Sequence, residues 1–178
     1  MSLHAKFFPA AYNCMRETGF CITWLDIMHW SRMYDLAVGA GFKVTRWPFV
    51  WVKSYPCLNQ MAQYNITKST EFAMICRKGN TTLPQKQPTN WIMTGRDELS
   101  ENHPFAKPFA LWERLITAHT IENQSILDPF AGSNSSVISG IRLGRNMYGC
   151  ELDEALYNRG LQILKDFHLS TTPKARFI

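Results

Sequence analysis

The chain has 178 residues, 46% of them hydrophobic, and a formal net charge of +5, which suits one globular domain with a core of its own. No apolar run approaches the roughly 18 residues of a membrane span, and the N-terminal stretch lacks the order of segments that makes a signal peptide. These properties predict a cytoplasmic protein and disfavour membrane and secreted ones. The charge mildly favours a nucleic-acid partner, although a solvated basic surface is the plainer interpretation.

Cysteine and histidine usage narrows the possibilities further. The five cysteines include no C-x-x-C pair, and an odd number without a disulfide framework predicts reduced thiols in a cytosolic protein. The five histidines are scattered along the chain. A zinc site would need clustered ligands, so no metal site is predicted.

Predicted helices and strands alternate in the first half of the chain. Helices are predicted over residues 5–17 and 29–39, and strands over 20–25, 42–52 and 71–77. The run FCITWL at 20–25 is apolar throughout and is typical of a buried strand. Pro48 indicates a bulge or an edge position within 42–52, and residues 54–69 read as a loop.

The second half begins with a long polar stretch at 79–104 that contains three prolines. It is predicted to be a variable surface loop, because structureless stretches of this length inside small domains are usually functional or disordered. Beyond it, helices are predicted over 108–120, 135–143 and 153–167, and strands over 125–129 and 146–150. Strands separated by helices predict an α/β fold, with a mostly parallel sheet covered by helices on both faces. Ligands of such sheets bind beyond the carboxyl ends of the strands.

The stretch ILDPFAGSNSSVISGIRLGRNMYGCELDE at 126–154 places polar residues at two such ends. Asp128 can hold the turn that follows it or accept a hydrogen bond from a ligand amine. Gly132 and Ser133 let the chain turn tightly and are expected to leave backbone N–H groups uncovered. Glu151 follows the next strand, where an acid typically accepts hydrogen bonds from ribose hydroxyls.

The turn itself restricts the ligand. A dinucleotide site normally requires G-x-G-x-x-G and a nucleoside triphosphate site G-K-[ST], and neither occurs here. A turn with one glycine and no basic residue suits a nucleoside without a phosphate chain, such as S-adenosylmethionine. The plainer alternative is a strand–turn–helix whose acids are merely exposed to solvent.

Several motifs, in the family's order, resemble those of the DNA amino-methyltransferases, which methylate adenine N6 or cytosine N4. ILDPFAGSNSS at 126–136 resembles the family's Asp-Pro-Phe-x-Gly-Ser-Gly-Thr-Thr cofactor motif. HPFAKP at 103–108 is similar to the His-Pro-x-x-Lys-Pro motif that precedes it where the catalytic half comes first. The other matches are 145–153 with the second cofactor strand, Trp91-Ile92 with a tryptophan before the lysine-proline motif, and 51–53 and 70–79 with later strands of the catalytic half. The resemblance covers residues 19–167 and implies a Rossmann-like fold that uses S-adenosylmethionine.

The resemblance also implies a role for each matching position. Glu151 would bind the ribose, and His103 and Lys107 would approach the methionine end of the cofactor. The residues that would line the cofactor are Asp128, Phe130, Ala131, Gly132, Ser133 and Asn134. Asn134 stands where the family usually has glycine, but asparagine tolerates left-handed backbone angles, so the turn can survive.

The family's catalytic motif, an Asp, Asn or Ser followed by Pro-Pro and an aromatic residue, has no match. Its polar groups accept the hydrogens of the amine and its aromatic ring stacks on the flipped base. The chain contains no Pro-Pro, and Asp128-Pro129-Phe130 fits the cofactor role better. No catalytic residue is therefore assigned. The chain is interpreted as one partial methyltransferase domain over 1–178, incomplete at its N-terminus and inactive by itself.

Three functions stay open: a DNA amino-methyltransferase represented mainly by its cofactor-binding half, an inactive S-adenosylmethionine-binding module or subunit, and a methyltransferase for a small molecule or protein. DNA binding is expected to be weak and electrostatic, because the net charge is small. The family's target-recognition region usually lies where residues 79–102 lie here, and this stretch is short, so little sequence preference is expected. The family's catalytic strand would lie between 20–25 and 125–129. Exposed edges there predict a homo-oligomer, direct pairing of the two strands, or filling by a missing N-terminal segment, by residues 1–18 or by the tail at 168–178.

Overall fold

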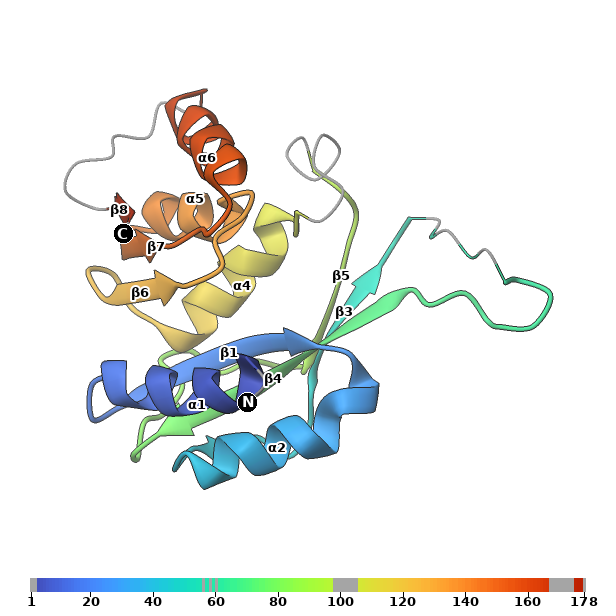
Figure 1. Ribbon diagram of the computed structural model, residues 1–178, viewed down its shortest axis with the longest axis horizontal. Helices are drawn as coiled ribbons and strands as arrows, with labels where there is room; N and C mark the ends of the chain where they lie inside the picture. Colours follow the sequence, from blue (N-terminus) through green and yellow to red (C-terminus); the bar gives the residue numbers. More distant parts are fainter. Residues whose placement is uncertain are drawn as a thin grey trace. The chain divides into compact units, whose positions relative to one another are not determined.

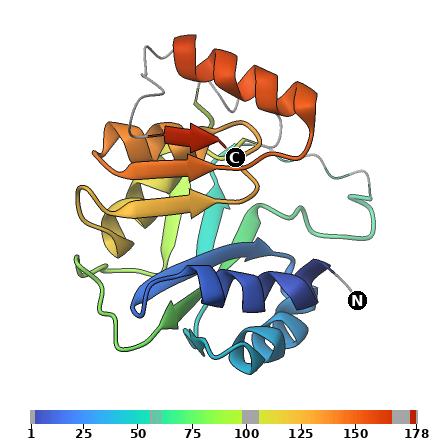
Figure 2. The same cartoon turned by 60° about the vertical axis from the view of Figure 1, so that its left-hand side comes forward.

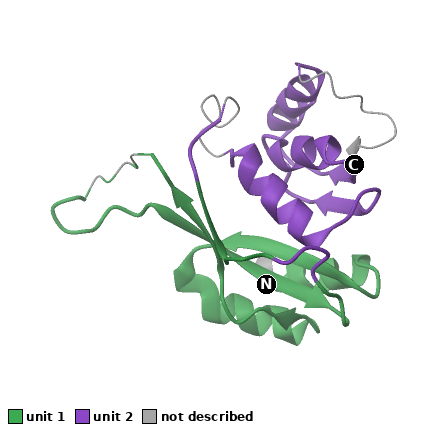
Figure 3. Ribbon diagram, turned by 180° about the vertical axis from the view of Figure 1, so that it is seen from behind, with its two compact units in different colours: residues 1–82, 87–93 green, residues 83–86, 94–178 purple. Residues whose placement is uncertain are grey.

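The computed structural model describes residues 3–55, 57, 59, 61–97, 106–166 and 175–177. The chain divides into two compact units, coloured separately in Figure 3. Unit 1 comprises residues 1–82 and 87–93, and unit 2 comprises residues 83–86 and 94–178. That the two together form one methyltransferase domain stays a prediction.

Unit 1 is built on an antiparallel sheet around a long central strand. The strands are β1 (Gly19–Leu25), β2 (Lys43–Val44), β3 (Phe49–Lys53), β4 (Thr70–Lys78) and β5 (Trp91–Thr94). Their order is β1-β4-β3-β5, and β2 also pairs with β4. β4 runs antiparallel to β1, β2 and β3, and the seven pairs of the β1–β4 ladder extend from Gly19↔Lys78 to Leu25↔Phe72. The prediction of a mostly parallel sheet is therefore wrong for this half of the chain.

Two helices pack on one face of this sheet, α1 (Leu3–Cys14) and α2 (Trp30–Gly39) (Figure 1). A short 3₁₀ turn, Ile27–His29, leads into α2 and is capped by Asp26, whose side chain accepts from the Met28 N–H. Both helices contribute to one buried cluster with β4. Its members are Phe8, Met33, Ala37, Phe42, Met74 and Cys76. Met74 and Cys76 are two residues apart on the strand, so both side chains point to the helical face.

A buried lysine closes the end of α1. Lys78 is 8% exposed, and its ammonium group donates to the carbonyl oxygens of Tyr12 and Met15, each at 3.0 Å. The same group lies 4.5 Å from the centre of the Tyr12 ring. Helix C-termini leave carbonyl groups unsatisfied, so the lysine replaces hydrogen bonds that the helix cannot make itself.

Unit 2 is built on parallel strands separated by helices. The elements are α4 (Phe109–His119), β6 (Ser125–Asp128), α5 (Ser135–Arg142), β7 (Asn146–Gly149), α6 (Glu154–Asp166) and β8 (Ala175–Phe177). The strands lie side by side in the order β6-β7-β8 (Figure 2). Because both ladders are parallel, with Asp128 opposite Gly149, the carboxyl ends of β6 and β7 meet at one edge of the sheet.

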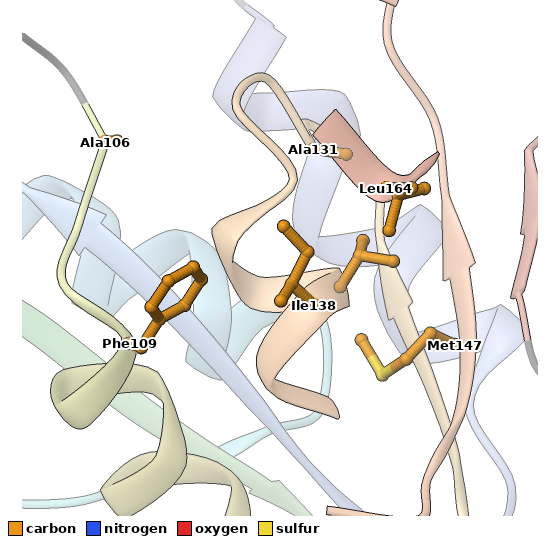
Figure 4. Close-up of a cluster of buried hydrophobic side chains, with 7 residues drawn as sticks. Ala106, Phe109, Ala131, Ile138, Met147 and Leu164 are labelled. Atoms are coloured by element: carbon orange, nitrogen blue, oxygen red, sulfur yellow. The ribbon is translucent and has the colours of Figure 1, made fainter. Parts of the chain in front are cut away.

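The core of unit 2 joins the described helices α4, α5 and α6 to the sheet (Figure 4). Its buried members are Ala106, Phe109, Ala131, Val137, Ile138, Met147 and Leu164. Helix α5 lies so close to β7 that a methyl group added at Gly140 would stand 2.0 Å from the sulfur of Met147. Only a residue without a side chain allows that approach.

The predicted elements agree with the structure within a few residues, with three exceptions. The strand predicted over 42–52 is two strands, because residues 45–48 between Val44 and Phe49 belong to no strand. The loop predicted over 79–104 contains β5, while its residues 98–104 lie outside the described part. The third exception is β8 (Ala175–Phe177), a strand in the tail of the chain where none was predicted. None of the described helices has the length and hydropathy to cross a membrane.

Candidate functional site

Asp128 ends β6 and organises the loop that leads into α5. One carboxylate oxygen accepts the Phe130 N–H at 3.0 Å, and the other accepts the hydroxyl of Ser136 in the first turn of the helix. Its backbone carbonyl accepts the Cys150 N–H at 2.9 Å, which continues the parallel ladder to β7. Asp128 therefore holds the turn, one of the two roles that the sequence suggested.

Two residues of this turn have left-handed backbone angles. Gly132 has φ 48° and Asn134 has φ 60° with ψ 15°. Asn134 is the N-cap of α5, and its carbonyl accepts the Ile138 N–H at 2.8 Å, as the first hydrogen bond of the helix requires. The prediction that asparagine can replace the family's glycine in a left-handed conformation is confirmed.

Glu151 follows β7 and reaches across to the turn after β6. Its carboxylate accepts the Gly132 N–H at 2.9 Å through one oxygen and the Asp153 N–H at 3.0 Å through the other. The expectation that the Gly132 N–H is uncovered is therefore wrong, because Glu151 already pairs with it. Each carboxylate oxygen can accept a second hydrogen bond, so Glu151 keeps capacity for a ligand hydroxyl.

The side chains of the turn divide into buried and exposed ones. Ala131, Ser133 and Asn134 are buried, whereas the ring of Phe130 is 60% exposed. The side-chain oxygen of Asn134 is buried without a hydrogen-bond partner. The turn thus exposes an aromatic ring beside the half-buried Glu151, while Ser133 and Asn134 are buried.

Helix α6 packs directly on the turn through a glycine. A methyl group added at Gly160 would lie 2.2 Å from the side-chain nitrogen of Asn134 and 3.4 Å from the carbonyl oxygen of Gly132. Sequence reasoning missed this residue, although an isolated glycine in a helical pattern is a signal of close packing. It also missed the hydrogen bond from the Trp112 indole to the Ser135 hydroxyl, 2.9 Å long, which ties α4 to the start of α5.

The structure bears on one of the two residues expected at the methionine end. Lys107 stands two residues before α4, next to Ala106, which shares a core cluster with Ala131 of the turn. The segment that carries Lys107 therefore packs into the same core as the turn. His103 lies outside the described residues.

Unit 1 has a cavity of about 380 Å³ where β1 ends and β4 begins. Its charged side chains are paired: Lys53 lies 2.8 Å from Glu71, and Lys68 lies 2.9 Å from Asp26. The Met28 N–H and the Lys68 ammonium group both hold the pKa of Asp26 below its ordinary value. Each of the two acids thus lies in an ion pair with a lysine.

Comparison with known proteins places this arrangement in a family. A family model described as a DNA methylase of the N6/N4 type matches residues 6–162. The chain is 34% identical over 153 residues to a putative methylase, YubD, of Escherichia coli K12, covering 86% of this chain and 65% of YubD. It is 31% identical over 131 residues to the type II methyltransferase M2.LlaDCHI of Lactococcus lactis, covering 64% of this chain and 48% of that protein.

Solved structures show the same fold. The M1.HpyAVI complex with S-adenosylmethionine superposes with a TM-score of 0.78 at 22% identity, covering 90% of this chain and 81% of that one. The cytosine-N4-specific PvuII DNA methyltransferase superposes with a TM-score of 0.60 at 14% identity, covering 83% and 70%. The predicted resemblance and the predicted Rossmann-like α/β class are both confirmed.

Proposed function

The chain belongs to the DNA methylase family, and from this premise we propose that unit 2 binds S-adenosylmethionine at the carboxyl ends of β6 and β7. One observation carries the proposal. Glu151 hydrogen-bonds to the Gly132 N–H across two adjacent parallel strand ends, where open α/β sheets bind their ligands. The whole protein is proposed to be a DNA amino-methyltransferase, and the chain spans 65% and 48% of the two curated relatives above.

The residues present fit this cofactor. Glu151 has acceptor capacity left for ribose hydroxyls, and the exposed ring of Phe130 offers an apolar face to an adenine. The turn contains no lysine or arginine, which suits a ligand without phosphates. Asp128, Ala131, Ser133 and Asn134 shape the turn from within, and Lys107 and His103 are proposed for the methionine end. When bound, the cofactor supplies an electrophilic methyl group.

Methyl transfer needs groups that hold the target amine, and these are proposed to lie outside this chain. An exocyclic amine is a weak nucleophile because its lone pair is delocalised into the ring. The family's Pro-Pro motif supplies acceptors for its hydrogens, and the 178 residues contain no such motif. We expect this chain alone to bind the cofactor without methylating DNA, and a transfer assay with labelled methyl groups tests this.

Two sheet edges support the proposal of a partner. β1 is at one end of its sheet and has one strand partner among the described residues, and so has β6. β1 carries no charge and no proline over Gly19–Leu25, so it lacks the usual protection of an edge strand against pairing. A second copy of the chain, or a further segment of the protein, is proposed to cover such an edge.

A cytoplasmic location is proposed from the cysteines. All five are free thiols in the structure. Burial raises the pKa of Cys21 and of Cys76 to about 12, so both stay protonated and unreactive at neutral pH. A reducing compartment suits this set of thiols.

Calorimetry with Glu151→Ala tests the proposed cofactor site. The substitution is expected to weaken S-adenosylmethionine binding by about 1.5–3 kcal/mol, because charged hydrogen bonds are lost. Glu154→Ala, which removes an equal charge from the exposed first turn of α6, is the matched control and should leave affinity unchanged. Equal affinity for wild type and Glu151→Ala would remove Glu151 from the site.

A further inference from the structure

The loop between β3 and β4 presents apolar side chains at its tip. Tyr64 is 76% exposed, Ile66 is 98% exposed and Met61 is 50% exposed. They lie within seven residues of one another, on the segment that projects from the ends of β3 and β4 in Figure 1. Exposure of three large apolar side chains on one loop is unfavourable in water, and such patches usually mark an interaction site.

The tip is held in shape by its own hydrogen bonds. The Asn59 side chain donates to the Asn65 carbonyl at 2.9 Å and to the Thr67 hydroxyl at 3.2 Å, and it accepts the Met61 N–H at 3.1 Å. The Tyr64 and Asn65 N–H groups both donate to the Met61 carbonyl at 2.9 Å. The apolar side chains therefore lie on a turn that its own hydrogen bonds hold in shape, which lowers the entropic cost of binding through them.

The base of the loop is tied to the neighbouring strand. Lys68 donates to Asp26 at 2.9 Å, and Asp26 directly follows β1. The loop thus has one fixed point at the sheet and one internal fixed point at Asn59.

The charge of the chain indicates what the tip meets. Unit 1 contains nine Lys and Arg against four Asp and Glu, a net charge of +5, whereas unit 2 contains ten of each. The whole excess of positive charge therefore belongs to unit 1. Residues 54–69 contain no acid, and their one charged residue is Lys68. A polyanion can approach this loop without repulsion.

We propose that Met61, Tyr64 and Ile66 form a wedge that contacts the bases of duplex DNA, an inference that rests on the proposed function. The positive net charge of unit 1 attracts the phosphates, and the apolar tip enters between or beside the bases. Proteins that deform DNA insert side chains of this kind between base steps, and an aromatic ring such as Tyr64 stacks on bases of any sequence. The wedge positions the duplex while the cofactor is held by unit 2.

The experiment compares wild type with the double variant Tyr64→Ala, Ile66→Ala on a short duplex that carries 2-aminopurine. Fluorescence anisotropy gives the affinity, and the 2-aminopurine signal reports unstacking of the bases. The double variant is expected to bind roughly 5- to 150-fold more weakly per lost stacking contact, and to lose the 2-aminopurine increase. Its salt dependence should be unchanged, because no charge was removed.

Controls separate this inference from the proposed function. Met28→Ala and Tyr34→Ala remove exposed side chains elsewhere in unit 1 and should leave DNA binding intact. S-adenosylmethionine affinity should be the same in all these variants. Unchanged DNA affinity and 2-aminopurine signal in the double variant would overturn the wedge while leaving the cofactor site standing. So would sedimentation showing that the tip holds two copies of the chain together instead.

Discussion

The two units of this protein use their polar and apolar residues in opposite ways at the two loops for which we propose a function. In unit 2, the turn after β6 buries Ser133 and Asn134. In unit 1, the loop after β3 exposes Tyr64 and Ile66. Buried polar groups and exposed apolar ones are the informative exceptions to the usual distribution. We propose that the first marks a turn that binds a small ligand and that the second marks a surface that binds a large one.

The charges divide along the same line. Unit 1 carries the whole net charge of +5 and five of the six tryptophans, whereas unit 2 is neutral. A basic, aromatic unit suits contact with a nucleic acid, and a neutral unit with a polar turn suits a cofactor without phosphates. We therefore assign DNA to unit 1 and the cofactor to unit 2, as parts of the proposed function.

The largest expected effect comes from a matched pair of phenylalanines, one from each unit. Phe8 is fully buried and Phe130 is 60% exposed. Phe8→Ala should lower the free energy of unfolding by about 3–5 kcal/mol, as expected for an emptied core position. Phe130→Ala should change the free energy of unfolding by less than about 0.5 kcal/mol but weaken binding of the cofactor. Chemical denaturation and calorimetry on both variants check this, and a large loss of stability in Phe130→Ala would show that the ring has a structural role instead.

A pair of helical glycines gives the next largest effect. Gly160→Ala places a methyl group 2.2 Å from the Asn134 side chain, so it should lower the free energy of unfolding by about 1–3 kcal/mol. It should also weaken binding of the cofactor, because the turn moves. Gly39→Ala meets nothing within 4 Å and should stabilise its helix by roughly 0.5–1 kcal/mol. Thermal unfolding measures both. If Gly160→Ala bound the cofactor as tightly as wild type, the packing of helix α6 would not determine the shape of the turn.

The smallest effect is a dependence on pH that arises in unit 2. Burial lowers the pKa of His119 below its ordinary value of 6.5, against the opposing effect of its hydrogen bond to the Leu115 carbonyl. Because the folded state disfavours the proton, the contribution of His119 to stability is complete above 6.5 and decreases as pH falls below it. His119→Gln should flatten the slope of unfolding free energy between pH 7 and about 5. An unchanged slope would assign the dependence to other groups.

Sequence reasoning located the strand ends of unit 2 but misjudged the sheet of unit 1. Asp128 and Glu151 could be placed because each ends an apolar run, and the alternation with helices implied parallel strands. The strands at 42–52 and 71–77 are separated by a loop without a predicted helix. Parallel neighbours are usually joined through a helix, so the lack of a predicted helix there favoured an antiparallel pair.

Other features depended on contacts that no local pattern contains. The bond between Glu151 and the Gly132 N–H requires the register that sets Asp128 opposite Gly149. β5 was missed because Trp91–Thr94 is a strand of four residues inside a polar, proline-containing stretch. Its pairing with β3 decides its structure, and its own propensity does not.

The proposal that unit 2 binds the cofactor and unit 1 binds DNA can be tested most directly by hydrogen–deuterium exchange on the wild-type chain. S-adenosylmethionine and duplex DNA are added in separate samples. We expect the cofactor to slow exchange at residues 130–136 and 151–153, and DNA to slow exchange at residues 61–68. Protection of 61–68 by the cofactor, or of the turn after β6 by DNA alone, would contradict it.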